Sequence, residues 1–171
     1  MAILQLLNEH HDRNTFDCGN EALNTFLQRQ AGQQAKRGIS RTHVLVDAQA
    51  PNTIVGFHTL VYNLAKEVPL TSKLRTYPHP LAALTLARMG VDHRYQGHSY
   101  GADILVDAIC RVAAAHAAAA PLMGLFVDAK TDEVVRFYER FGFEKVNGDT
   151  DPRYLWLPIG ACVDVARETM D

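Results

Sequence analysis

The chain has 171 residues, of which 47% are hydrophobic and 21% charged, and a formal net charge of −2. This length suits a single domain, residues 1–171, with a substantial core, and the charge gives no general sign of nucleic-acid binding. No apolar run approaches the roughly 18 residues of a membrane span, and the N-terminus lacks the pattern of a signal peptide. The cysteines Cys18, Cys110 and Cys162 form no CxxC pair or metal-ligand spacing. We therefore expect a reduced, cytoplasmic protein without a metal.

The first elements are a short strand over Ile3–Leu7 and a polar turn over Asn14–Asn20. A helix follows, which Gly19 or Asn20 can cap. Its apolar residues recur at helical spacing on one face, namely Leu23, Phe26, Leu27 and Ala31. A more basic segment over Gln28–Gly38, helical or irregular, continues from this helix.

A local basic patch is expected in the same part of the chain. Between Ala22 and Val46 there is no acidic residue, whereas four basic ones are present: Arg29, Lys36, Arg37 and Arg41. Such a run can attract an anionic partner to a mildly acidic protein.

An antiparallel hairpin is predicted next, with strands over Thr42–Val46 and Thr53–Tyr62 and a turn around Gln49–Asn52. The polar connection Asn63–Pro80 that follows contains three prolines. It is longer than most connections in compact domains, and loops of this length tend to be functional or mobile.

The most informative stretch begins with a buried strand over Leu84–Val91 and the loop Asp92–Gly101. The apolar period changes to that of a helix after this loop, at Ile104, Leu105, Ala108, Ile109, Val112 and Ala113. A helix N-terminus with free N–H groups can bind phosphate. The loop lacks both the Walker pattern and the GxGxxG dinucleotide pattern. By itself, this stretch is equally consistent with an ordinary strand-to-helix turn.

The C-terminal part begins with a buried strand over Leu122–Val127. Thr131 or Asp132 can cap a short helix, and Gly142 ends it. The apolar face of this helix comprises Val134, Val135, Phe137 and Tyr138. A final hairpin pairs Phe143–Val146 with Arg153–Leu157, and Ala161–Asp171 is a short helix or a tail.

The loop resembles the acetyl-CoA loop of the GNAT N-acetyltransferases, whose pattern Gln/Arg-x-x-Gly-x-Gly/Ala falls on Gln96, Gly97, His98, Ser99, Tyr100 and Gly101. Ser99 departs from it where glycine is usual, and serine disfavours the positive φ that glycine permits. The run Phe137–Phe143 is similar to the family's second motif. The resemblance covers Thr42–Leu157 and implies an α+β GNAT fold. This fold has a central mixed, mostly antiparallel sheet that splays at the cofactor strands, with helices on both faces.

The resemblance also implies roles in an acetyl-CoA-dependent reaction. The backbone of Met89, Gly90 and Val91 would bind the pantetheine arm, and an N–H there would polarise the thioester carbonyl. N–H groups from Gln96 to Gly101 would hold the pyrophosphate, and His98 would pack against the cofactor. Tyr138 would protonate the departing thiolate. Asp132 stands where many relatives have an asparagine that contacts the cofactor arm, with a helix N-cap as the alternative role.

No general base is named. The candidates by residue type are His58, His79, His93, His98 and His116. An acceptor amine of low pKa would need no strong base.

A narrower resemblance concerns toxin acetyltransferases of the TacT kind, carried by Phe16–Leu27 and by the strand Leu86–Asp92. It implies acetylation of the α-amine of aminoacyl-tRNA, which blocks translation, a ribbon–helix–helix antitoxin as partner, and a homodimer. Basic side chains could then meet the tRNA backbone, with Arg37, Arg41 and Arg88 as the substrate candidates beside Arg29, Lys73 and Arg75.

Two alternatives stay open. The net charge of −2 is unlike that of strong tRNA binders, which favours an enzyme that acetylates a small amine or a protein N-terminus. The second alternative is a non-catalytic acetyl-CoA-binding module, and the presence of Tyr138 argues against it.

Overall fold

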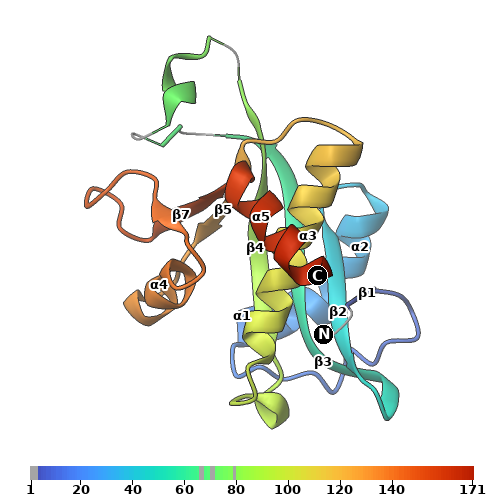
Figure 1. Ribbon diagram of the computed structural model, residues 1–171. Coiled ribbons are helices and arrows are strands. Elements are labelled where there is room, and N and C mark those ends of the chain that lie inside the picture. Colours follow the sequence, from blue (N-terminus) through green and yellow to red (C-terminus); the bar gives the residue numbers. More distant parts are fainter. Residues whose placement is uncertain (1–3, 66–67, 70–71, 79) are drawn as a thin grey trace. The chain divides into compact units, whose positions relative to one another are not determined.

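The structure is a computed structural model that describes residues 4–65, 68–69, 72–78 and 80–171. Its described strands form one sheet in the order β1-β2-β3-β4-β5-β7-β6 (Figure 1). β4 and β5 are parallel, whereas β1–β2, β2–β3, β5–β7 and β6–β7 are antiparallel. The predicted fold class, a mixed and mostly antiparallel sheet with helices, is confirmed. The strands are β1 Gln5–Leu6, β2 Arg41–Asp47, β3 Ala50–Leu64, β4 Ala82–Val91, β5 Gly124–Asp128, β6 Glu144–Lys145 and β7 Tyr154–Pro158.

The helical segments follow the predicted order. Asn20 caps α1, because its side chain accepts a hydrogen bond from the N–H of Leu23 at 3.2 Å. No helix in the described ranges is long and apolar enough to cross a membrane. The helices are α1 Glu21–Thr25, a π-helical turn η1 Phe26–Gln30, α2 Ala31–Lys36, α3 Tyr100–Ala118, α4 Asp132–Glu139 and α5 Ile159–Met170, and two short 3₁₀ turns are η2 Lys73–Thr76 and η3 His93–Tyr95.

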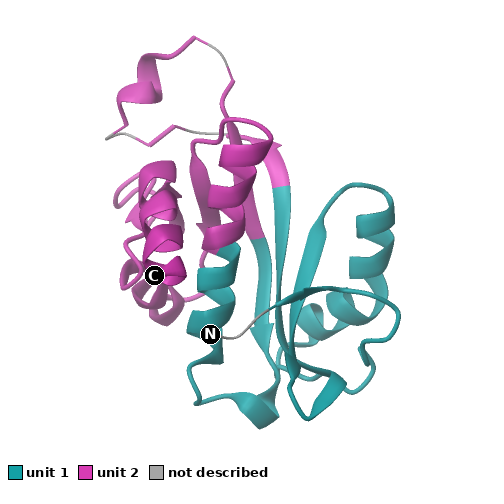
Figure 2. Cartoon of the chain, turned by 45° about the vertical axis from the view of Figure 1, so that its right-hand side comes forward, with its two compact units in different colours: residues 1–61, 87–108 teal, residues 62–86, 109–171 magenta. Residues whose placement is uncertain are grey.

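The chain divides into two compact units (Figure 2). Unit 1 comprises Met1–Val61 and Ala87–Ala108, and unit 2 comprises Tyr62–Leu86 and Ile109–Asp171. β3, β4 and α3 each contribute residues to both units. The expectation of a single domain over the whole chain stays a prediction.

In unit 1, helices cover both faces of the β2–β3 hairpin. On one face Phe57 packs against Phe16, with ring centroids 5.5 Å apart, and against Phe26. On the other face Ile104 of α3 packs with Leu45 and Val55. Gly56 permits this approach, since a Cβ there would lie 2.4 Å from Cδ1 of Ile104. The helix α3 is therefore seated directly on the backbone of β3.

Unit 2 has its own apolar core under β5 and β7. It consists of Ala83, Met123, Phe126, Val146 and Trp156. The parallel ladder between β4 and β5 joins Leu84–Leu86 to Leu125–Val127 and ends there. The part of β4 after Leu86 thus lies outside that ladder.

Several strands differ from the sequence expectation by one or two residues at their ends, as for β5, observed over Gly124–Asp128 and predicted over Leu122–Val127. Three elements differ more. The hairpin turn is tighter, because Asp47 pairs with Ala50 and the expected turn residues after Gln49 join β3. The C-terminal segment is the helix α5, not a tail. The first strand is limited to Gln5–Leu6, and Ile3 lies outside the described residues.

Candidate functional site

The end of β4 presents backbone groups on a free edge. The Asp92 N–H donates to the Val55 carbonyl at 2.8 Å. Because backbone groups alternate along a strand, Gly90 also faces β3, and its carbonyl oxygen is 2.8 Å from where a Gly56 Cβ would stand. The backbone groups of Met89 and Val91 therefore point to the opposite edge, beyond the end of the β4–β5 ladder.

The loop that follows forms a concave array of amide groups. Gly97 has φ of +83° and Ser99 has φ of +64°, so left-handed residues alternate along the loop. No N–H from Gly97 to Gly101 donates a hydrogen bond to a described residue. Successive N–H groups in such a turn form an anion-binding nest, and here they lead into the N-terminus of α3. Ser99 adopts the left-handed conformation although it lacks the freedom of glycine.

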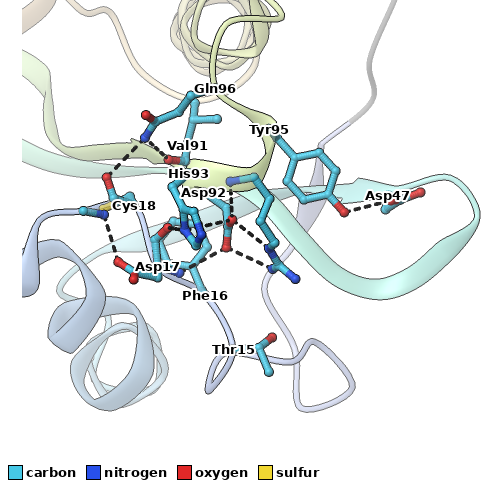
Figure 3. A network of polar contacts seen from close by, with 12 residues as sticks. Thr15, Phe16, Asp17, Cys18, Asp47, Val91, Asp92, His93, Tyr95 and Gln96 are labelled. Atoms are coloured by element: carbon cyan, nitrogen blue, oxygen red, sulfur yellow. Dashed lines mark hydrogen bonds and ion pairs between the residues drawn. The ribbon is translucent and has the colours of Figure 1, made fainter.

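The carboxylate of Asp92 is the centre of the frame that holds this loop (Figure 3). It is buried and accepts hydrogen bonds from Arg94 Nε at 2.9 Å and from the Asp17 N–H at 3.1 Å. Burial opposes its charge, but the bonds from Arg94 and from backbone N–H groups outweigh that effect and lower the pKa of Asp92. The carboxylate is therefore ionised at neutral pH.

Gln96 joins the loop to the N-terminal turn. Its Nε2 donates to the carbonyl oxygens of Val91 at 2.9 Å and Cys18 at 3.2 Å (Figure 3). The His93 N–H donates to the Asp17 carbonyl at 2.8 Å. The side chain of Gln96 thus fixes the loop. Only the backbone of this residue is then available to contact a bound anion.

Aromatic rings border the loop. His98 Nδ1 lies 3.0 Å from the Gln96 carbonyl oxygen, and its ring lies 6.2 Å from that of Tyr100. Tyr95 donates its hydroxyl to Asp47 at 2.8 Å. The loop is therefore supported from β2 as well as from the N-terminal turn.

Tyr138 lies in unit 2, at the end of α4. The residue is only 4% exposed, and its ring centroid is 5.2 Å from that of Phe143 and 5.4 Å from that of Phe137. Burial raises the pKa of the Tyr138 hydroxyl well above its ordinary value. The phenol accordingly keeps its proton over the whole neutral range, as a hydrogen-bond and proton donor must.

The alternative N-cap role for Asp132 is wrong. Thr131 is the cap, because its Oγ1 accepts the Val134 N–H at 3.2 Å. Asp132 is the first residue of α4 and accepts from Arg153 Nε at 3.3 Å. Its contact with a cofactor arm stays a prediction.

The three basic residues predicted to meet substrate have different surroundings, all within unit 1. Arg37 and Arg41 are exposed, at the end of α2 and the start of β2. Arg88 is half-buried, with its guanidinium 4.7 Å from the centroid of the Phe26 ring. Stacking on an aromatic face fixes the orientation of a guanidinium.

Most histidine candidates for a general base have structural partners. His58 is fully buried with Nε2 2.7 Å from Asp107 Oδ2, and His116 Nδ1 accepts the Leu122 N–H at 2.9 Å. His79 lies outside the described residues. In the described ranges no three His, Cys, Asp or Glu residues gather as a metal site would require.

Comparison with known proteins supplies the family. A family model described as "Acetyltransferase (GNAT) domain" matches residues 39–145. The chain belongs to the GNAT acetyltransferase family. A tRNA-acetylating toxin of Mycobacterium tuberculosis is 30% identical over 152 residues, which are 88% of each chain.

Solved GNAT structures resemble the chain over nearly its whole length. A tyrosine-to-phenylalanine mutant of KacT has a TM-score of 0.85 at 27% identity, covering 95% of this chain and 98% of that one. AtaT complexed with acetyl-methionyl-tRNAfMet has a TM-score of 0.82 at 28% identity, covering 94% and 96%. Further AtaT structures contain AcCoA or the C-terminus of the antitoxin AtaR.

Sequence reasoning did not identify the contacts that hold the loop in place. Asp92 directly follows a buried strand, a position where an Asp commonly caps the next turn, and its side chain does accept the Arg94 N–H at 2.9 Å. That signal was available. The contacts of Asp92 with Asp17 and of Gln96 with Cys18 join residues more than 70 positions apart, and local patterns carry no information about them.

Proposed function

We propose that this GNAT acetyltransferase transfers the acetyl group of acetyl-CoA to the α-amine of an aminoacyl-tRNA, and thereby blocks translation as a toxin. The main support for this proposal is the similarity, over most of both chains, to the tRNA-acetylating toxin and to AtaT solved with acetyl-methionyl-tRNAfMet. The acceptor is a charged tRNA, and the reaction belongs to the cytoplasm, where aminoacyl-tRNA is used.

Acetyl-CoA is the co-substrate, and the end of β4 with its loop is suited to it. The pyrophosphate takes the N–H groups from Gly97 to Gly101, where the nest and the start of α3 both favour an anion. The pantetheine arm pairs at this edge with the Met89 backbone and the Val91 N–H as an added strand would, while the Val91 carbonyl stays bonded to Gln96 Nε2. One of these N–H groups then stabilises negative charge on the thioester oxygen.

The chemistry needs one proton donor. The α-amine nitrogen attacks the thioester carbon, the carbon–sulfur bond breaks, and the thiolate takes a proton from the Tyr138 hydroxyl. The nitrogen releases a proton to water. Esterification to tRNA lowers the pKa of an α-amino group, so much of the amine is already neutral and no strong base is needed. Burial raises the pKa of Tyr138, so the phenol is protonated before the reaction, and after donating to sulfur it regains a proton from water.

The tRNA backbone meets exposed basic side chains of unit 1. In the described part of that unit, helix α2 and the start of β2 carry several basic side chains without an ion pair, namely Lys36, Arg37 and Arg41, with Arg29 before them. Arg88 adds a guanidinium beside Met89 on β4. These residues supply local positive charge despite the net charge of −2.

The same proposal includes two protein partners. A ribbon–helix–helix antitoxin restrains the enzyme, as suggested by the solved complexes of AtaT with the antitoxin AtaR. The enzyme also pairs with a second copy of itself. Copurification of the protein with the product of an adjacent reading frame, and its mass in solution, test these two partners separately.

The test of function is transfer of labelled acetyl from acetyl-CoA to purified total aminoacyl-tRNA. We expect label on the aminoacyl group, none on deacylated tRNA, and a large loss with Tyr138→Phe. Label on small amines or protein N-termini instead of tRNA, with acetyl-CoA binding intact, would contradict the toxin reaction. Absence of any transfer by a protein that binds acetyl-CoA would favour the non-catalytic module.

A further inference from the structure

Two residues of β3 that lie two positions apart, Gly56 and His58, contact α3. The helix residues that they contact are one turn apart. Gly56 receives Ile104, and His58 binds Asp107 with Nε2 and Oδ2 2.7 Å apart. Positions two apart on a strand share a face, as do positions three apart on a helix. The helix is therefore fixed on the strand by one apolar and one polar contact, both inside unit 1.

The polar contact is deeply placed. His58 is fully buried, and the Asp107 side chain is 18% exposed. His43 of β2 pairs with His58 in register, and the two rings lie 5.4 Å apart on this face. A buried carboxylate–imidazole pair has one favourable geometry and cannot slide without leaving a buried polar group unpaired.

We propose that the His58–Asp107 pair is a positioning element for the pyrophosphate nest. It fixes the axial position of α3, and thus of the N–H groups from Gly97 to Gly101 that precede and begin this helix. Asp107 lies two turns after Tyr100, where α3 starts, so a shift of the helix moves the nest by the same amount. The inference rests on the proposed assignment of this loop to acetyl-CoA.

The proposal is tested by comparing two ligands that differ in the pyrophosphate. Dissociation constants are measured for acetyl-CoA and for S-acetylpantetheine, which lacks the nucleotide. Asp107→Ala is expected to weaken the binding of acetyl-CoA by about 10- to 100-fold, because a small displacement of the N–H groups that bind a ligand is costly. The same substitution should change the dissociation constant of S-acetylpantetheine by less than about twofold. Asp107→Asn keeps an oxygen at the same place and should restore most of the acetyl-CoA affinity.

A matched control lies on the same two strands. Thr42 and Thr59 share a buried hydroxyl hydrogen bond of 2.7 Å, and Thr59 is on the Phe57 face, away from α3. Thr59→Val should lower the melting temperature but leave acetyl-CoA affinity within about twofold. If Asp107→Ala fails to fold, Asp107→Glu, one methylene longer, displaces the helix and should give the same selective loss.

Three results would overturn the inference. One is equal weakening of both ligands by the Asp107 variants, and another is an equal loss of acetyl-CoA affinity in Thr59→Val. The third is a wild-type protein that binds acetyl-CoA no more tightly than S-acetylpantetheine, which would also refute the assignment of the loop to pyrophosphate. The first two would leave that assignment standing.

Discussion

The loop in unit 1 and Tyr138 in unit 2 are held in place by different kinds of interaction. The loop is held by charged and polar groups, with Asp92 ionised between Arg94 and the Asp17 N–H. Tyr138 is held by aromatic rings and is almost fully buried. One region has fixed N–H groups that suit an anion, and the other has a phenol that keeps its proton.

The difference follows from what each proposed role demands. An array of amide groups binds pyrophosphate well only if hydrogen bonds hold it in place beforehand. A phenol in apolar surroundings stays protonated at neutral pH, because burial disfavours its ionised form. We therefore assign cofactor affinity to the loop and the chemical step to Tyr138, and the following changes test this division.

Tyr138→Phe should have the largest effect. It removes one hydroxyl and leaves the contacts with Phe137 and Phe143, so kcat should fall by about 10- to 1000-fold while KM for acetyl-CoA changes little. Steady-state kinetics with an acceptor amine measure both values. Tyr62→Phe, which removes an exposed hydroxyl in the same unit, is the control and should be unchanged. A rise in KM equal to the fall in kcat would refute the separation of roles.

Asp92→Ala should have the next effect, on stability and on the loop together. It leaves the Asp17 N–H and the Arg94 guanidinium without their acceptor, which should cost about 2–3 kcal/mol of unfolding free energy. Urea unfolding measures this loss. Affinity for acetyl-CoA should also fall, whereas kcat at saturation should stay close to the wild-type value.

The same carboxylate predicts a pH dependence. The pKa of Asp92 is lower in the folded protein than in the unfolded chain, so its contribution is complete above the unfolded pKa of about 4 and is lost as pH falls through the folded value. Melting temperatures between pH 5 and 2 should show this loss in the wild-type protein. Asp92→Asn should show a weaker dependence, and an identical dependence in both proteins would contradict the prediction.

Gly97→Ala should have a smaller effect, confined to the backbone. Apart from its chain neighbours, no described residue comes within 4 Å of a Cβ at this position, but φ is +83°. The strain should amount to about 1 kcal/mol and should weaken the binding of acetyl-CoA several-fold. Gly160→Ala, in α5 where a Cβ would also meet nothing within 4 Å, controls for the added methyl group. Isothermal titration calorimetry with acetyl-CoA compares the two variants.

Ser99→Ala should have the smallest effect. It retains the backbone N–H and the left-handed strain and removes only the hydroxyl, so acetyl-CoA affinity should change by less than about twofold. A loss of tenfold or more would instead assign the serine hydroxyl a direct bond to a phosphate oxygen. The same titration distinguishes the two cases.

Much of the fold could be predicted because its signals are local. The change from strand to helix period around Asp92–Gly101, the cap at Asn20 and the hairpin of β2 and β3 each depend on neighbouring residues. The choice between Thr131 and Asp132 as cap could not be made this way, since both residue types favour the N-cap position and the general preference is for Asp, not Thr.

The rest of the candidate site could not be predicted, for two physical reasons. The bonds of Gln96 to Cys18 and of His58 to Asp107 depend on tertiary proximity. The left-handed conformation of Ser99 opposes its own local preference and is imposed by its surroundings. The sequence therefore predicts which residues face the cofactor, while the structure identifies the side chains that hold them in place.

The most direct test of the division of labour is steady-state kinetics on four proteins: wild type, Asp92→Asn, Tyr138→Phe and the double variant. We predict that Asp92→Asn raises KM for acetyl-CoA, that Tyr138→Phe lowers kcat, and that the two effects multiply in the double variant within about twofold. A single substitution that moves both constants equally, or a double variant no worse than Tyr138→Phe alone in kcat/KM, would contradict this prediction.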